Sequence, residues 1–261
     1  MPLNAERRKA LSKLVPEGAI VTRQWLLENH FDRHAIDNLV KTRQLHILSY
    51  GIYARGELSN SWEPIAYALQ AYDKSDCVVG GLTALELQGL AHYLPLSKKK
   101  QNVHLYSPKP LPMWITNFSP DLIFTRYNSS EVFKELKENN TEFFTTTRAW
   151  KENMDGIIIS VPERAMLECL LTVPDKLSFD HANELMQGMT SFSPRVVQSL
   201  LEQCTNVKCK RLFLWLAERQ NYPWFSKLNL NKIDLGSGNR MLVKGGKLNK
   251  KYQITVPSSY E

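Results

Sequence analysis

Residues 22–56 read TRQWLLENHFDRHAIDNLVKTRQLHILSYGIYARG and carry signals for two short helices and a hairpin. Thr22 is placed to cap a helix that runs to about residue 29, because a hydroxyl or carboxylate oxygen at the N-cap accepts a hydrogen bond from the first amides. Asp32 is placed to cap a second helix at about 33–43. The apolar residues of that helix recur at helical spacing and are Ile36, Leu39 and Val40. The short break between the two helices is typical of a helix-turn-helix.

A hairpin signal follows the second helix directly. Apolar and β-branched residues at 45–48 and 52–54 flank the turn Ser49-Tyr50-Gly51. An earlier helix at about 5–15 ends at Pro16-Glu17-Gly18. Three helices followed by a hairpin predict a winged helix-turn-helix over residues 1–58, and a winged helix is a DNA-binding domain.

The second capped helix has the side chains of a recognition helix. Opposite its apolar stripe lie His34, Asn38, Lys41 and Thr42, with Arg33 and Asp37 on the flanks. Asn and Arg make bidentate contacts to base edges in the major groove, whereas Lys suits phosphates. The predicted DNA contacts are Arg23, Arg33, His34, Asn38, Lys41, Thr42, Arg43, Tyr50 and Arg55.

Charge is distributed unevenly along the 261 residues. The chain has 33 Lys and Arg against 26 Asp and Glu, a formal net charge of +7. Residues 1–56 carry +4, residues 57–205 carry −5, and residues 206–261 carry +8. Two basic ends around an acidic middle suggest one or two surfaces for a polyanion.

The remainder of the chain predicts a larger mixed α/β domain at 59–261, which makes the fold class α+β. A helix is expected at 62–72, and a buried strand, a Gly80-Gly81 turn and a helix closing near Tyr93 follow it. A turn is favoured over a phosphate site at Gly80-Gly81, because the other glycines of a nucleotide-binding loop are absent. Strands are expected at 103–106, 122–127 and 156–161, and helices at 162–172, 179–188, 194–204 and 208–219.

The last stretch, 235–256, predicts strands separated by glycine turns. Its lysines interleave with Tyr252, an arrangement that can follow a phosphate backbone, although a solvated basic hairpin is an equal alternative. The predicted second basic surface consists of Lys208, Lys210, Arg211, Arg240, Lys244, Lys247, Lys250 and Lys251.

Composition excludes several other classes of protein. A hydrophobic content of 43% is enough to fill ordinary cores. The longest apolar run, 212–217, is far shorter than the roughly 20 residues of a membrane span. The N-terminus lacks an apolar signal segment, so a cytoplasmic location is expected. Four scattered cysteines predict free thiols, with neither a metal site nor a cofactor.

No hydrolase motif is present, and one nuclease pattern has to be weighed. Pro120-Asp121 and Glu135-Leu136-Lys137 match the spacing of a PD-(D/E)xK site, in which carboxylates hold Mg²⁺. Such sites usually place the second half on a buried strand, whereas 131–138 is typical of a polar surface helix. We therefore expect no enzyme. A Mg²⁺-dependent nuclease, and a module that binds protein or RNA rather than DNA, remain as alternatives.

Several longer segments resemble the AbiEi family of antitoxins from type IV toxin-antitoxin and abortive infection systems. They are GIYAR at 51–55, GGLTALELQGLAHYL at 80–94, VHLYSPKPLPMW at 103–114, SVPERAMLECL at 160–170, KRLFLWLAERQNYPWF at 210–225 and DLGSGNRMLVKGGKLNKKYQITVP at 234–257.

The resemblance implies a transcriptional autorepressor that binds inverted repeats in double-stranded DNA upstream of its own operon. It also implies a C-terminal domain that counteracts a nucleotidyltransferase-class toxin without needing a stable complex, and it implies no catalysis. Recognition would fall on 33–43 and the wing on 49–55. Relatives often carry a basic residue where this chain has Tyr50.

Overall fold

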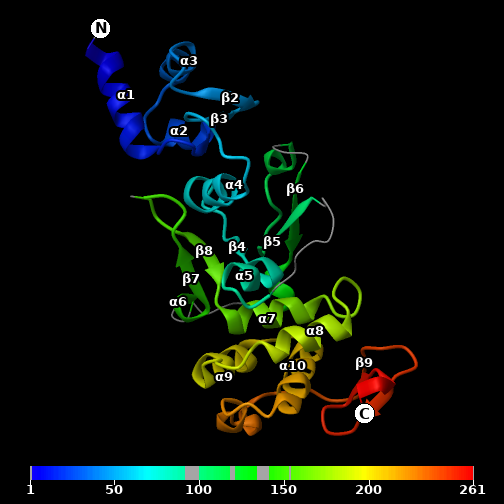
Figure 1. The fold of residues 1–261 in the computed structure, drawn as a ribbon. Helices are drawn as coiled ribbons and strands as arrows, with labels where there is room; N and C mark the ends of the chain where they lie inside the picture. The colour runs from blue at the N-terminus through cyan, green and yellow to red at the C-terminus, as the bar shows by residue number, and fades with distance from the viewer. Residues whose placement is uncertain (1, 92–99, 118–120, 134–140, 153, 261) are drawn as a thin grey trace.

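The computed structural model describes residues 2–91, 100–117, 121–133, 141–152 and 154–260. Three tiers follow one another from the N-terminus, as Figure 1 shows: a small helical domain with a hairpin, a five-stranded sheet, and a group of helices that ends in the C-terminal segment. The fold is mixed α+β, as predicted. Within the described residues, no helix combines the length and the apolar character that are needed to cross a bilayer.

The N-terminal tier is the predicted arrangement of three helices and a hairpin. Its elements are α1 (Pro2–Leu14), β1 (Ile20–Thr22), α2 (Arg23–Glu28), α3 (Arg33–Lys41), β2 (His46–Ser49) and β3 (Ile52–Ala54). The strands form a small antiparallel sheet in the order β1-β3-β2, so β1 adds a third strand to the predicted hairpin.

The second tier is a mixed sheet in the order β6-β5-β4-β8-β7. Its elements are α4 (Glu63–Tyr67), which continues as a π-helix (Ala68–Tyr72), β4 (Val78–Val79), α5 (Gly81–Leu87), β5 (Gln101–Tyr106), β6 (Leu122–Tyr127), α6 (Thr141–Phe144), β7 (Thr145–Arg148) and β8 (Ile157–Ser160). β5 pairs parallel with β6, and β4 pairs parallel with β8. α5 ends earlier than expected because Gly89 turns the chain at a positive φ of 72°, and Tyr93 lies outside the described residues.

The third tier contains the four helices that the sequence predicts. They are α7 (Pro162–Leu171), α8 (Phe179–Gln187), α9 (Pro194–Gln203) and α10 (Val207–Gln220). The chain ends in short strands and 3-10 turns, namely Phe225–Lys227, Leu230–Lys232, β9 (Arg240–Met241), β10 (Lys247–Asn249), β11 (Ile254–Val256) and Ser258–Tyr260. The strand order β10-β11-β9 agrees with the predicted strands and glycine turns.

The molecule has two separate hydrophobic cores, one above the central sheet and one among the C-terminal helices. One core joins the N-terminal tier, represented by Leu26 and Ile36, to Ile65 of α4 and to one face of the sheet, including Val103 and Leu105 of β5. The other core is formed mainly by α5, the helices α7–α10 and residues 224–256 of the C-terminal segment. Because the N-terminal tier shares a core with the sheet, it is packed onto the rest of the molecule.

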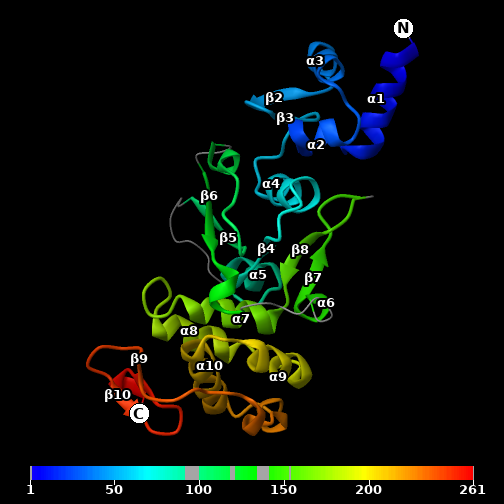
Figure 2. The same cartoon turned by 180° about the vertical axis from the view of Figure 1, so that it is seen from behind.

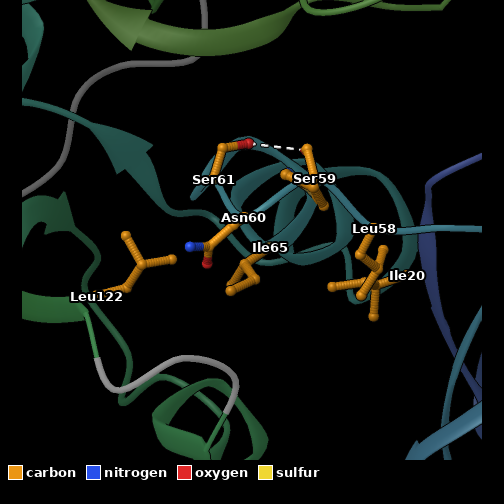
Figure 3. A pocket seen from close by; sticks show the side chains of 8 residues that line it. Ile20, Leu58, Ser59, Asn60, Ser61, Ile65 and Leu122 are labelled. Carbon is orange, nitrogen blue, oxygen red and sulfur yellow. Dashed lines mark hydrogen bonds between the residues drawn. The ribbon is translucent and has the colours of Figure 1, made fainter.

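Further contacts hold this junction. Lys151 Nζ, from the β7–β8 loop, donates to the carbonyl oxygen of Glu17 at 2.5 Å. Residues 58–61 form the linker between the first two tiers, and a cavity of about 170 Å³ lies where they pass the start of β6. Figure 3 shows Asn60 extending toward Leu122 on one side of this cavity, while the hydroxyls of Ser59 and Ser61 are joined by a hydrogen bond of 2.9 Å. The linker is therefore a short, folded segment between the first two tiers.

Candidate nucleic-acid interface

Both predicted N-caps of the helix pair are present. The Thr22 hydroxyl accepts a hydrogen bond from the Trp25 amide at 3.1 Å, and the Asp32 carboxylate accepts one from the Ala35 amide at 2.7 Å. The hydrogen bond from the Ala35 amide is the main reason that the pKa of the Asp32 carboxyl group is lowered. Both caps use oxygen-bearing side chains at the boundary, so local sequence was sufficient to predict where α2 and α3 begin.

α3 buries one side and exposes the other, as the helical periodicity predicts. Ala35, Ile36 and Leu39 are buried, and Val40 is partly buried. The polar side chains on the outer face are all exposed, and they are Arg33, His34, Asp37, Asn38 and Lys41. Thr42, the C-cap, and Arg43, which turns the chain at a positive φ of 57° just past the observed end of the helix, are exposed as well. Asp37 is the sole carboxylate among them. This face therefore offers several hydrogen-bond donors at a spacing that fits the major groove.

Helix α1 adds two arginines beside this face, and neither is among the predicted DNA contacts. Arg7 donates to the Asp32 carboxylate at 3.0 Å, which ties α1 to the start of α3. Arg8 is exposed, and together with Asn38 and Thr42 it lines a shallow crevice of about 10 Å³ between the two helices. The basic run Arg7-Arg8-Lys9 was the available signal, but only the packing of α1 on α3 brings Arg8 beside Asn38.

The wing is fastened to α2 through Arg23. Its guanidinium donates to the Tyr53 hydroxyl from Nε at 3.0 Å and from Nη2 at 2.8 Å, and this bond raises the pKa of Arg23. Arg23 Cζ also lies 5.5 Å from the centroid of the Tyr50 ring. Tyr50 stands at the tip of the hairpin and is 92% exposed, so the wing presents an aromatic side chain in place of a cation.

Arg55 has partners within the domain. Its guanidinium donates to the carbonyl oxygen of Val15 at 2.5 Å and lies 3.5 Å from the Glu17 carboxylate. These contacts close the C-terminal end of α1, where helix carbonyls lack partners along the chain. A DNA contact by Arg55 stays a prediction.

The second basic surface differs from the prediction at two of its eight positions. Lys210 and Arg211 are 3% and 1% exposed, so they do not belong to a surface. The reason is that α10 is enclosed on nearly all sides and carries its residues 209–217 into the core. Tyr252 is buried as well, which excludes it from stacking on bases in this conformation.

The buried Arg211 guanidinium holds the C-terminal segment by hydrogen bonds to its backbone. It donates to the carbonyl oxygens of Leu235, Gly236, Gly238 and Gln253 at 2.6 to 3.1 Å. The surrounding cations Arg240, Lys244, Lys247, Lys250 and Lys251 are exposed, and Lys208 is half-buried. Lys251 forms an ion pair with Glu218 of α10. Residues 235–256, which we call the basic segment, therefore form a small folded unit whose cationic rim consists of the exposed residues Arg240, Lys244, Lys247, Lys250 and Lys251.

Two family models match the chain over nearly its whole length. Residues 4–96 match the AbiEi antitoxin N-terminal domain of a transcriptional regulator, and residues 100–257 match the transcriptional regulator and AbiEi antitoxin of type IV TA systems. The chain belongs to the AbiEi antitoxin family. The N-terminal tier of this AbiEi antitoxin fits the winged helix that the sequence predicts.

Comparison with solved structures gives a distant likeness in fold. The AbiEi chain is similar to the RV2827C protein from Mycobacterium tuberculosis, with a TM-score of 0.51 and 16% sequence identity over 97% of this chain and 91% of that chain. No curated protein matches the sequence. The two AbiEi family models divide the chain between residues 96 and 100, whereas the boundary at residue 58 stays a prediction.

The glycine pair of the AbiEi chain is a turn, as the sequence favoured. Gly81 has a positive φ of 52°, and its amide donates to the Glu168 carboxylate at 2.9 Å. Glu168 also accepts from the Ser160 hydroxyl and from Arg164 Nε at 2.7 Å. A carboxylate of the chain itself thus occupies the start of α5, where an anion would have to bind.

Only part of the PD-(D/E)xK pattern lies within the residues that the structure describes. Asp121 lies just before β6, whereas Pro120, Glu135 and Lys137 lie outside the described residues. Among the described residues, no cluster of three or more His, Cys, Asp or Glu side chains could hold a metal ion.

Proposed function

We propose that this AbiEi antitoxin is a sequence-specific repressor of its own operon that binds double-stranded DNA with its winged helix. The exposed face of α3 supports this proposal most directly. Asn38 lies within that face, with Arg33 and His34 toward one end and Lys41 toward the other, and Arg43 follows just past the end of the helix. This order suits base contacts along the groove and phosphate contacts at the C-terminal end of the helix.

The operator we expect is an inverted repeat. The described part of the chain holds one winged helix, which would read one half-site, and two copies related by a two-fold axis would read two half-sites. The Tyr50 wing would add an aromatic contact beside the major groove, and Arg8 a further cation beside α3.

The C-terminal domain would carry the second activity, counteraction of a nucleotidyltransferase-class toxin. This proposal comes from the family's role, and the toxin would be counteracted without a stable complex with the antitoxin. The exposed cations of the basic segment are the surface we assign to this activity. A cationic rim fits a polyanion, and an RNA on which the toxin acts is one such polymer.

A gel shift tests the repressor proposal. The full chain should bind the DNA upstream of its operon about a thousandfold more tightly than random DNA of equal length and composition. The Lys41→Gln, Arg43→Gln variant should weaken both complexes, while the matched variant Lys227→Gln, Lys232→Gln should weaken neither. Equal affinity of the unaltered chain for operon and random DNA would contradict sequence-specific repression.

A further inference from the structure

A cavity of about 460 Å³ with a mixed polar and apolar lining lies on the side of the central sheet that faces α7 and α8. Both views show these helices between the sheet and the C-terminal elements (Figures 1 and 2). The volume falls within the range of roughly 300 to 1,000 Å³ that is usual for small-molecule sites. Neither the DNA-binding face nor the basic segment contributes residues to this cavity.

Strand alternation explains why this wall is polar. Val103 and Leu105 of β5 point into the core shared with the N-terminal tier. Their neighbours Asn102, His104 and Tyr106 consequently face the opposite side and line the cavity. The parallel register places His104 opposite Thr125, and Tyr106 opposite Tyr127, so both strands contribute to one wall.

A hydrogen-bonded chain orients these side chains. The Thr125 hydroxyl donates to Asn102 Oδ1 at 2.7 Å, and Asn102 Nδ2 lies 3.2 Å from His104 Nε2. Burial, assisted by the charge of Lys176, lowers the pKa of His104 to about 4, so the ring is neutral near pH 7. Because an amide nitrogen can only donate, Nε2 accepts and Nδ1 keeps its proton as a donor.

The rest of the lining combines one lysine, a histidine and two tyrosine rings with the uncharged residues Leu82, Cys169, Thr172 and Leu177. Lys176, from the α7–α8 loop, places Nζ 4.7 Å from the centroid of the Tyr127 ring. Tyr127 in turn stacks on Tyr106, with ring centroids 5.0 Å apart. His181 of α8 completes this side, and no carboxylate side chain is among the described residues that line the cavity. Lys176 therefore suits the charge of an anion, and the polar groups of β5 and β6 suit the edge of a planar base.

We propose that this cavity binds a small organic phosphate of mononucleotide size, with the phosphate at Lys176 and the base against the polar wall of β5 and β6. Inorganic phosphate alone would occupy a small part of the space. Asn102, His104 and Thr125 offer donors and acceptors to the edge of a base, while Lys176 supplies the charge for the phosphate. The site is independent of the proposed operator contact.

Isothermal titration of the full chain with AMP, GMP, CMP and UMP tests the proposal. At least one mononucleotide should bind saturably, about tenfold more tightly than both inorganic phosphate and the matching nucleoside. No saturable binding of any of the four at about 5 mM would overturn the proposal. Binding no tighter than that of inorganic phosphate would overturn the assigned ligand class.

Variants locate the site. Lys176→Met should weaken mononucleotide binding about tenfold, because it removes the cation that pairs with the phosphate, whereas the exposed control Lys227→Met should leave it unchanged. Leu82→Trp, which fills the cavity from α5, should abolish binding, and Thr125→Val provides a milder change at the opposite wall. Thermal melting checks that each variant is folded. Unchanged affinity in folded Lys176→Met and Thr125→Val proteins would overturn the assignment of the site.

Discussion

Asn38 is the residue at which the DNA-binding proposal can be tested most sharply. Its side chain is exposed in the middle of the outer face of α3, and its backbone carbonyl accepts the Thr42 hydroxyl at 2.8 Å. The backbone carbonyl of Asn38 therefore has a hydrogen-bond partner that does not involve the Asn38 side-chain amide. The amide remains available for a bidentate contact to an adenine edge.

Asn38→Ala should weaken operator binding by roughly 1 to 3 kcal/mol and relax specificity at one base pair. The helix itself should persist, because alanine favours helix and the buried side of α3 is unchanged. Competition gel shifts with operators altered one base pair at a time measure both effects. Asn231→Ala, at an exposed position of the 3-10 turn Leu230–Lys232, is the matched control. Equal loss of affinity for every operator would assign Asn38 to the phosphate backbone instead.

The C-terminal segment depends on one side chain of α10. Arg211 is buried and hydrogen-bonded to carbonyl oxygens on both sides of the basic segment, which otherwise has only short strands. Arg211→Met would leave these carbonyls without their donor, and we expect a loss on the order of 3 kcal/mol in the free energy of unfolding of the segment. Arg211→Lys should rescue little, because an ammonium lacks the planar fork of donors.

Hydrogen exchange measures this effect locally. In Arg211→Met, amides of 235–256 should exchange faster, whereas those of α2 and α3 should keep their protection and operator binding should persist. Lys227→Met, at an exposed position outside 235–256, serves as the comparison. Uniformly faster exchange throughout the chain would show that Arg211 supports the whole fold rather than this segment.

Helix boundaries were predictable where the determining contacts are local. Thr22 and Asp32 bond to amides three residues ahead, so the starts of α2 and α3 can be read from the sequence. Strand β7, Thr145–Arg148, was missed because its residues TTTR lack apolar alternation and its pairing with β8 depends on a distant partner. β1 was not predicted as a strand, because its pairing with β3 likewise depends on a distant partner.

The candidate site was likewise predictable where local contacts determine it and not where distant contacts do. The exposed face of α3 follows from the periodicity of one helix, and all of its predicted residues are exposed. Lys210 and Arg211 were wrongly predicted on a surface, because charge in the sequence does not show that α10 is enclosed by α7, α8 and the C-terminal segment. Arg8 was missed because its neighbours come from another helix.

At the level of the whole molecule, the two basic ends are separated by the sheet and the helices. Figures 1 and 2 both place the winged helix and the C-terminal segment at opposite ends of the chain's long dimension. Electrostatic interactions are screened over about 8 Å at physiological salt. The two cationic surfaces should therefore act independently, one on operator DNA and the other on a different polyanion.

Salt dependence tests this independence. Lys41→Gln, Arg43→Gln should reduce the slope of log K against log salt for operator binding by about 0.9 for each phosphate that the variant no longer neutralises. Lys244→Gln, Lys250→Gln removes the same charge from the exposed rim of the basic segment and should leave that slope unchanged. The second variant should instead lose protection against the toxin in a growth assay. A slope reduced equally by both variants would mean that operator DNA contacts both ends of the molecule, in one complex or through a second copy of the chain.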